Sequence, residues 1–77
     1  MPQAYVLINV ESGAEDSLVN EMKKIEGVDE AYFSYGVYDI IAKVKADSME
    51  KLKDTVTRKI RTLSKVRSTL TLIMMEE

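Results

Sequence analysis

The sequence predicts an α+β domain in which a strand–helix–strand unit occurs twice, giving the order βαββαβ. Four apolar stretches rich in β-branched residues are spread along the chain, and such stretches are typical of strands. Between the first and second stretches, and between the third and fourth, apolar residues recur every three or four positions, as on one side of a helix. A short turn at residues 35–39 joins the two units.

Length and composition bound the possible functions. The 77 residues indicate one domain, residues 1–77. The chain has no cysteine and no histidine, which excludes disulfides, thiolate chemistry and Ser-His-Asp or Cys-His catalysis. No apolar run approaches the roughly 20 residues that span a bilayer. We therefore expect a soluble, cytoplasmic protein that is not an enzyme and has no membrane partner.

The first half of the chain contains the first predicted unit. Residues 5–10 are apolar except for Asn9 and are expected as a central strand covered on both faces. Ser12 and Glu15 match a capping box that would start the first helix. The apolar stripe of this helix comprises Ala14, Leu18, Met22 and Ile25. Gly27 can adopt the left-handed conformation that ends a helix, and residues 28–34 follow as the second strand.

The second half repeats the pattern. Residues 38–45 are the predicted third strand, and Asp47 or Ser48 is the predicted cap of the second helix. The stripe of that helix comprises Met49, Leu52, Val56, Ile60 and Leu63. Residues 66–75 are the predicted fourth strand. One face of this strand carries Ser68, Leu70, Leu72 and Met74, and the other carries Thr69, Thr71 and Ile73.

Right-handed crossovers place these elements in a four-stranded antiparallel sheet with both helices on one face, the ferredoxin-like arrangement. The first strand is apolar on both sides, so the face without helices would expose a large apolar patch. We expect two copies to pack sheet to sheet as a symmetric homodimer, a dimeric α/β sandwich or barrel. The alternative is a monomer with an apolar solvent face.

Binding of nucleic acid or metal is poorly supported. The same element order builds the RNA-recognition motif, but the predicted third strand has no aromatic residue after Tyr38 on which bases could stack. A net charge of −2 also argues against direct nucleic-acid binding. The acidic pairs 29–30 and 76–77 would point to opposite faces of an extended chain, so we expect no metal site and no cofactor.

The basic residues of the second helix, of the loop after it and of the start of the fourth strand form a charge run. They are Lys51, Lys53, Arg58, Lys59, Arg61, Lys65 and Arg67. A run of this kind is usually a solvated helix face, and cations are favourable near the C-terminus of a helix. We interpret it in that way.

The turn is the candidate ligand-binding element. Gly36 allows positive φ, and the amides of such a turn can donate to a carboxylate. Asp39 can accept from an ammonium group, and the hydroxyls of Thr69 and Thr71 can donate and accept. Tyr35, Val37 and Tyr38 could wall an apolar pocket. These groups suit a zwitterion; the alternative is that the turn only connects two strands.

These residues carry a family resemblance. The segments Gly36-Val37-Tyr38-Asp39-Ile40-Ile41 and Val44-Lys45-Ala46-Asp47, then Leu52, Ile60, Val66 and Thr69-Leu70-Thr71-Leu72, resemble the regulatory (RAM, ligand-binding) domain of Lrp/AsnC, or feast/famine, transcription regulators. The resemblance extends from Tyr5 to Met74.

The resemblance implies a domain that dimerises through its sheets, forms rings of dimers and binds small effectors, typically amino acids, between dimers. It assigns Gly36, Val37, Tyr38 and Asp39 to the ligand-contacting turn. It assigns Thr69 and Thr71 to the strand that approaches the ligand from a neighbouring subunit.

The family's regulators also carry an N-terminal helix-turn-helix domain, whereas this sequence begins at the first predicted strand. We therefore expect a stand-alone regulatory domain that senses amino acids through its assembly state. Two alternatives stay open: an assembly partner of full-length Lrp/AsnC regulators without its own ligand, and a small αβ-barrel enzyme.

Overall fold

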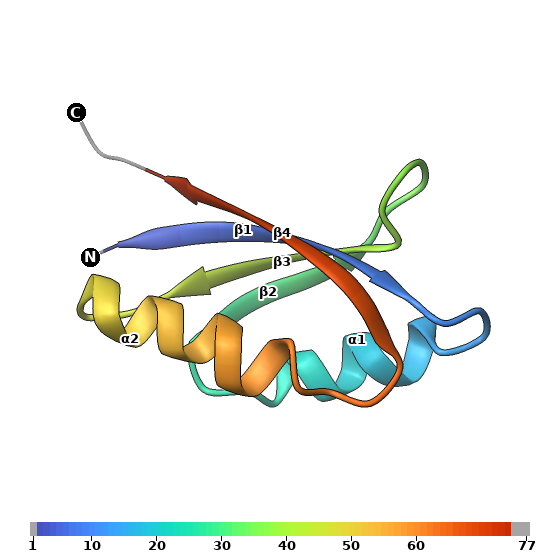
Figure 1. The fold of residues 1–77 in the computed structure, drawn as a ribbon, viewed down its shortest axis with the longest axis horizontal. Helices are drawn as coiled ribbons and strands as arrows, with labels where there is room; N and C mark the ends of the chain where they lie inside the picture. Colours follow the sequence, from blue (N-terminus) through green and yellow to red (C-terminus); the bar gives the residue numbers. More distant parts are fainter. Residues whose placement is uncertain (1, 75–77) are drawn as a thin grey trace.

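The computed structural model describes residues 2–74 and has the predicted order of elements (Figure 1). The strands are β1 (Gln3–Val10), β2 (Val28–Phe33), β3 (Ile40–Lys45) and β4 (Val66–Met74). The helices are α1 (Glu15–Lys23) and α2 (Met49–Asp54), and α2 continues directly into the π-helical segment η1 (Thr55–Ile60). Met75, predicted as the end of the last strand, and the pair 76–77 lie outside the described residues.

The four strands form one sheet of order β2-β3-β1-β4 in which every neighbouring pair is antiparallel. The helices lie together on one face of this sheet (Figure 1). The ferredoxin-like fold predicted from the sequence is therefore confirmed. β1 pairs with both β3 and β4, so it is a central strand, while β2 and β4 form the edges.

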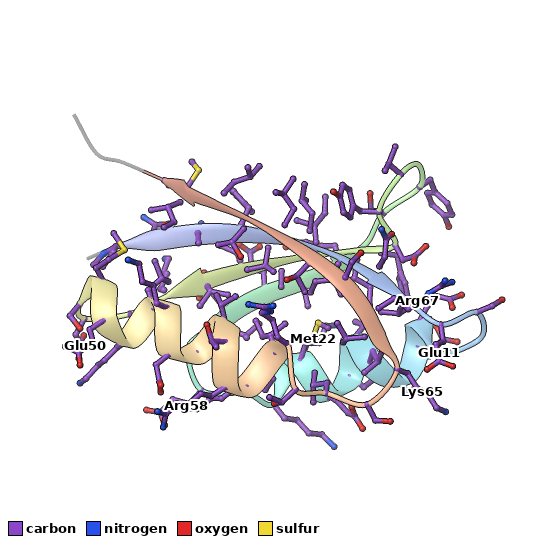
Figure 2. The ribbon with its side chains drawn as sticks, in the orientation of Figure 1. Glu11, Met22, Glu50, Arg58, Lys65 and Arg67 are labelled. Carbon is purple, nitrogen blue, oxygen red and sulfur yellow. The ribbon has the colours of Figure 1, made fainter. Side chains whose placement is uncertain are left out.

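The core lies between the helices and the sheet. Every second residue of β1 is buried there: Ala4, Val6, Ile8 and Val10. The stripe of α1 is confirmed, with Met22 directed toward the sheet (Figure 2), and the buried Val19 widens it beyond the prediction. The stripe of the second helix is confirmed from Leu52 onward. Met49 was wrongly included, because it is the first residue of α2 and is 38% exposed.

The two helix starts differ. Of the two predicted caps, Asp47 and Ser48, the N-cap of α2 is Ser48, whose Oγ accepts a hydrogen bond from the amide of Lys51 at 3.2 Å. The capping box predicted at Ser12 is wrong. Ala14 is the N-cap of α1 without a side-chain hydrogen bond, and the Glu15 carboxylate accepts from the amide of Gly13 at 2.8 Å. The carboxylate therefore closes the turn before α1 and does not reach back to the Ser12 amide.

The π-helical turn of η1 was not predicted. Its register is visible at Arg61, whose amide donates to the carbonyl of Val56, five residues earlier, at 2.9 Å. Thr55 is buried at the start of η1, beside Gly27. A Cβ at Gly27 would lie 3.4 Å from the Thr55 side chain and 3.4 Å from the Lys45 carbonyl oxygen. Gly27 has φ +101°, the left-handed conformation that was predicted, but α1 ends at Lys23 with Lys24 as its C-cap, so Gly27 does not end the helix. Its missing side chain instead leaves room for Thr55.

The face of the sheet away from the helices carries many apolar side chains. Side chains stand on this face along the strands in Figure 2. Its exposed large members are Tyr32, Leu70, Leu72 and Met74. One polar cluster interrupts it on β2 and β3: Lys43 Nζ lies 3.8 Å from Glu30 Oε2, and the Tyr32 hydroxyl donates to Glu30, which raises the pKa of Tyr32. The open face therefore combines apolar area with a defined charged pair.

Candidate ligand-binding site

The turn between β2 and β3 spans residues 34–39 and is longer than predicted. The amide of Ser34 donates to the carbonyl of Asp39 at 2.8 Å, which closes the hairpin. The amide of Asp39 donates to the carbonyl of Ile8 on β1 at 3.0 Å. β3 begins at Ile40, so the predicted strand start at Tyr38 is wrong by two residues. Gly36 has φ +141° at the tip, the conformation for which glycine was expected there.

Asp39 has a structural role that the sequence did not reveal. Its Oδ2 accepts a hydrogen bond from the amide of Val10, at the end of β1, at 2.9 Å. The carboxylate also lines a cavity of about 340 Å³, together with Glu15, Asp16, Phe33, Ser34 and Tyr35. This cavity, the turn cavity, has three acids and no cation among its described lining residues. Its charge suits an ammonium group.

The apex of the turn projects into solvent. Tyr35 is 99% exposed and Val37 is 83% exposed, while Tyr38 is half-buried. The apolar wall predicted from Tyr35, Val37 and Tyr38 is therefore not a closed pocket within one chain. Exposed side chains of this size at a hairpin tip are available to a second surface.

Thr69 and Thr71 lie on the helix-facing side of β4. They pair with Ile8 and Val6 of β1, whose side chains are fully buried under the helices. Both threonines line a cavity of about 370 Å³ between the helical rod α2–η1 and β4. We call this cavity the η1–β4 groove. Its other lining residues are Leu52, Lys53, Val56, Thr57, Arg61 and Ile73.

The predicted site residues do not meet within one chain. Asp39 and the threonines line different cavities, and β1 separates them. On one side of β1, the carbonyl of Ile8 accepts from the amide of Asp39. On the other side, Ile8 is paired with Thr69. One chain therefore presents two separate cavities, one acidic and one rich in hydroxyls, and these are the two candidate half-sites.

Sequence reasoning missed several residues of these half-sites. Glu15 and Asp16 join Asp39 in the turn cavity because the N-terminus of α1 lies beside the turn. Lys53, Thr57 and Arg61 border the groove at intervals of four residues along the rod. That spacing was present in the sequence, but the basic run was interpreted only as a solvated face.

Two further observations limit the kinds of site present. Within residues 2–74, no three acidic side chains are grouped closely enough to hold a metal ion. The same residues include no helix with the length and apolar character required to cross a membrane.

The fold and the two candidate half-sites are compatible with a ligand-binding domain, and comparison with known proteins shows the family. Residues 3–77 match the family described as the Lrp/AsnC ligand binding domain, and the chain belongs to this family. The domain is a regulatory part of transcription regulators and not an enzyme.

A curated relative and solved structures resemble the chain. It is 33% identical over 60 residues to regulatory protein AsnC of Escherichia coli K12, a match that covers 78% of this chain and 40% of AsnC. The chain thus spans less than half the length of that relative. It is 34% identical to hypothetical protein PHS023 from Pyrococcus horikoshii, with TM-score 0.93 and coverage of 100% of this chain and 93% of PHS023.

A second solved structure, TTHA0845 from Thermus thermophilus, is 32% identical, with TM-score 0.94 and coverage of 100% of this chain and 96% of TTHA0845. The match therefore extends over nearly the whole of both solved chains. The E. coli AsnC structure has TM-score 0.89 at 28% identity, and the aligned part covers 99% of this chain but 52% of AsnC.

Proposed function

We propose that this protein binds an amino-acid effector between subunits and acts in transcription regulation through its state of assembly. The observation that carries the proposal is the separation of the two half-sites, with Asp39 in one cavity and Thr69 and Thr71 in another. A ligand that needs both half-sites must contact two chains.

The chemistry of the half-sites suits a zwitterion. The acidic turn cavity would take the ammonium group, with Asp39 as the acceptor and the Gly36 turn supplying backbone amides. Val37 and Tyr38 would contact the ligand's side chain. Thr69 and Thr71 would hold the carboxylate from the second chain. A regulator from Neisseria meningitidis that shares this fold, at 14% identity, has been solved as an L-Met complex.

Assembly would proceed in two steps. The exposed apolar side chains of the open face, including Leu70 and Leu72, favour a homodimer packed sheet to sheet. Dimers would then join into a ring in which the turn of one dimer meets the groove of the next. A ligand bound across that contact stabilises the ring, because it binds only the state in which the contact exists.

The proposal treats residues 1–77 as a single cytoplasmic domain, and the described residues 2–74 include no helix-turn-helix element. Such a domain would not bind nucleic acid directly. Full-length Lrp/AsnC regulators that share its assembly surfaces would be the partners through which this domain acts on a gene.

The experiment that tests this function is calorimetry against the twenty amino acids, with native mass measured in parallel. We expect at least one amino acid to bind and to increase the population of the larger assembly. Asp39→Asn should abolish that binding, because it removes the charge but keeps an oxygen that can accept from Val10. Asp54→Asn, an exposed acid paired with Arg58 at 3.0 Å, is the matched control and should bind normally. No heat with any amino acid would reject the function as stated.

A second candidate function is an assembly partner without its own ligand. The apolar open face favours it, because sheet packing requires no effector. Mixing this protein with a full-length regulator of the same cell should then give mixed oligomers. Strict self-association in that experiment would argue against this candidate.

A further inference from the structure

The η1–β4 groove has a chemical character that the threonines alone do not account for. Its floor is apolar, because Leu52 and Val56 are buried beneath it. Its walls carry three hydroxyls, from Thr57, Thr69 and Thr71. Two cations, Lys53 and Arg61, complete the lining, and no acid is present among the described residues that border it. The volume of about 370 Å³ lies within the range of about 300–1,000 Å³ usual for ligand cavities.

Arg61 differs from the other basic residues of the helical rod. Arg58 Nε lies 3.0 Å from Asp54 Oδ1, and Lys51 Nζ lies 3.7 Å from Asp47 Oδ2. Figure 2 shows Arg58 on the side of the rod away from the sheet. Lys53 also borders a neighbouring cavity that includes Glu50 and Asp54, so acids lie near it. Arg61 borders the groove and is absent from that acid-containing cavity.

We propose that Arg61 is the carboxylate anchor of the groove and that the groove alone recognises an aliphatic carboxylate. A guanidinium presents a planar fork of donors that matches a carboxylate, and the hydroxyls on β4 and Thr57 can satisfy its remaining lone pairs. The apolar floor accepts the hydrocarbon part of the ligand. None of these groups would bind an ammonium group, so a ligand of the groove does not need one. The groove therefore accepts 2-oxo acids, the deaminated counterparts of amino acids.

The inference deepens the proposed function and rests on it for the amino-acid ligand. It adds a second ligand class, the 2-oxo acids, and a further ligand-binding residue, Arg61. A protein whose groove takes a 2-oxo acid while the turn cavity takes an ammonium group would distinguish the two members of a transamination pair. The amino acid would bridge two subunits, whereas the 2-oxo acid would fill the groove without bridging.

The test is an NMR titration of the full chain with 4-methyl-2-oxopentanoate, using its uncharged carboxamide as the control ligand. We expect the oxo acid to shift the amide signals of Thr69 and Thr71 and the carboxamide to leave them unchanged. Arg61→Gln should weaken the oxo-acid affinity by roughly tenfold or more, since it removes a charge-assisted interaction. Arg61→Lys should retain part of the affinity, because it keeps the charge but loses the fork.

Arg58→Gln is the matched control, since it removes a cation of the same rod that points away from the groove. It should bind the oxo acid normally. Shifts that are absent in the unmodified protein, equal for both ligands, or unaffected by Arg61→Gln would overturn the inference.

The same variants separate this inference from the proposed function. Amino-acid binding without oxo-acid binding would leave the proposed function standing and reject the groove as an independent carboxylate site. Oxo-acid binding without binding of any amino acid would support the groove and reject the proposed two-chain zwitterion site.

Discussion

The turn at residues 34–39 and the η1–β4 groove differ in what their polar groups already do within one chain. In the turn, Asp39 is tied to β1 through its amide and through its carboxylate, so the acid that would bind a ligand also holds the fold. In the groove, the hydroxyls of Thr69 and Thr71 line an open cavity on an edge strand. The turn is therefore expected to be sensitive to substitution in both stability and binding, and the groove in binding alone.

The largest effects should come from the isoleucines that anchor the two regions to the common core. Ile40 follows the turn, Ile60 ends η1 beside the groove, and both are fully buried. Replacing either with alanine should reduce the free energy of unfolding by about 2–5 kcal/mol, because it leaves a cavity. Chemical denaturation measures this. Met49→Ala, at an exposed position, should change it by less than about 0.5 kcal/mol. A small effect at Ile60 alone would mean that the wall of the groove is not packed on the core.

The next effect concerns the dual role of Asp39. Asp39→Ala should reduce the free energy of unfolding by about 1–3 kcal/mol, because the amide of Val10 loses its acceptor. Asp39→Asn should reduce it by much less, because an oxygen remains in place. Both changes should abolish amino-acid binding. Equal unfolding midpoints for the two variants would show that the hydrogen bond from the Val10 amide to Asp39 does not stabilise the fold.

A smaller effect is expected at the start of the rod that forms one wall of the groove. Ser48→Ala removes the side-chain acceptor of the Lys51 amide and should cost about 1 kcal/mol. Ser12→Ala, at the cap that the sequence suggested wrongly, should be nearly neutral. Thermal unfolding of both variants measures these changes in stability. An equal loss of stability in the two variants would mean that Ser12 caps α1 after all.

The smallest effect on stability should come from the groove itself. Thr71→Val exchanges a hydroxyl for a methyl group of similar size at a half-exposed position and should change stability by less than about 0.5 kcal/mol. Its effect on binding should be much larger, because a carboxylate loses a donor. Parallel measurement of unfolding and ligand affinity tests this separation. A stability loss comparable to that of Asp39→Ala would show that the groove is structural as well.

The sequence predicted features set by neighbouring residues better than features set by residues far apart in the sequence. Strand and helix identities followed from local periodicity, and the stripe at Leu18 and Met22 and the cap at Ser48 were placed correctly for that reason. The errors lie where distant contacts compete with local rules. Asp39 lies in the turn and not in the predicted strand, and there its amide donates to the carbonyl of Ile8 on β1, 31 residues earlier. The π-helical turn of η1 left no signal, because its buried residues fit an α-helical stripe equally well.

The candidate site illustrates the same limit. The sequence by itself determined which residues of β4 share a face, because side chains alternate along a strand. It also determined that a glycine-bearing turn with an acid joins the two halves. Only the tertiary structure decided that Thr69 and Thr71 lie on the helix side, beside Arg61, and that Asp39 lies in another cavity. Alternation fixes the partition of a strand into two faces, but the face that meets the helices depends on pairing between strands far apart in sequence.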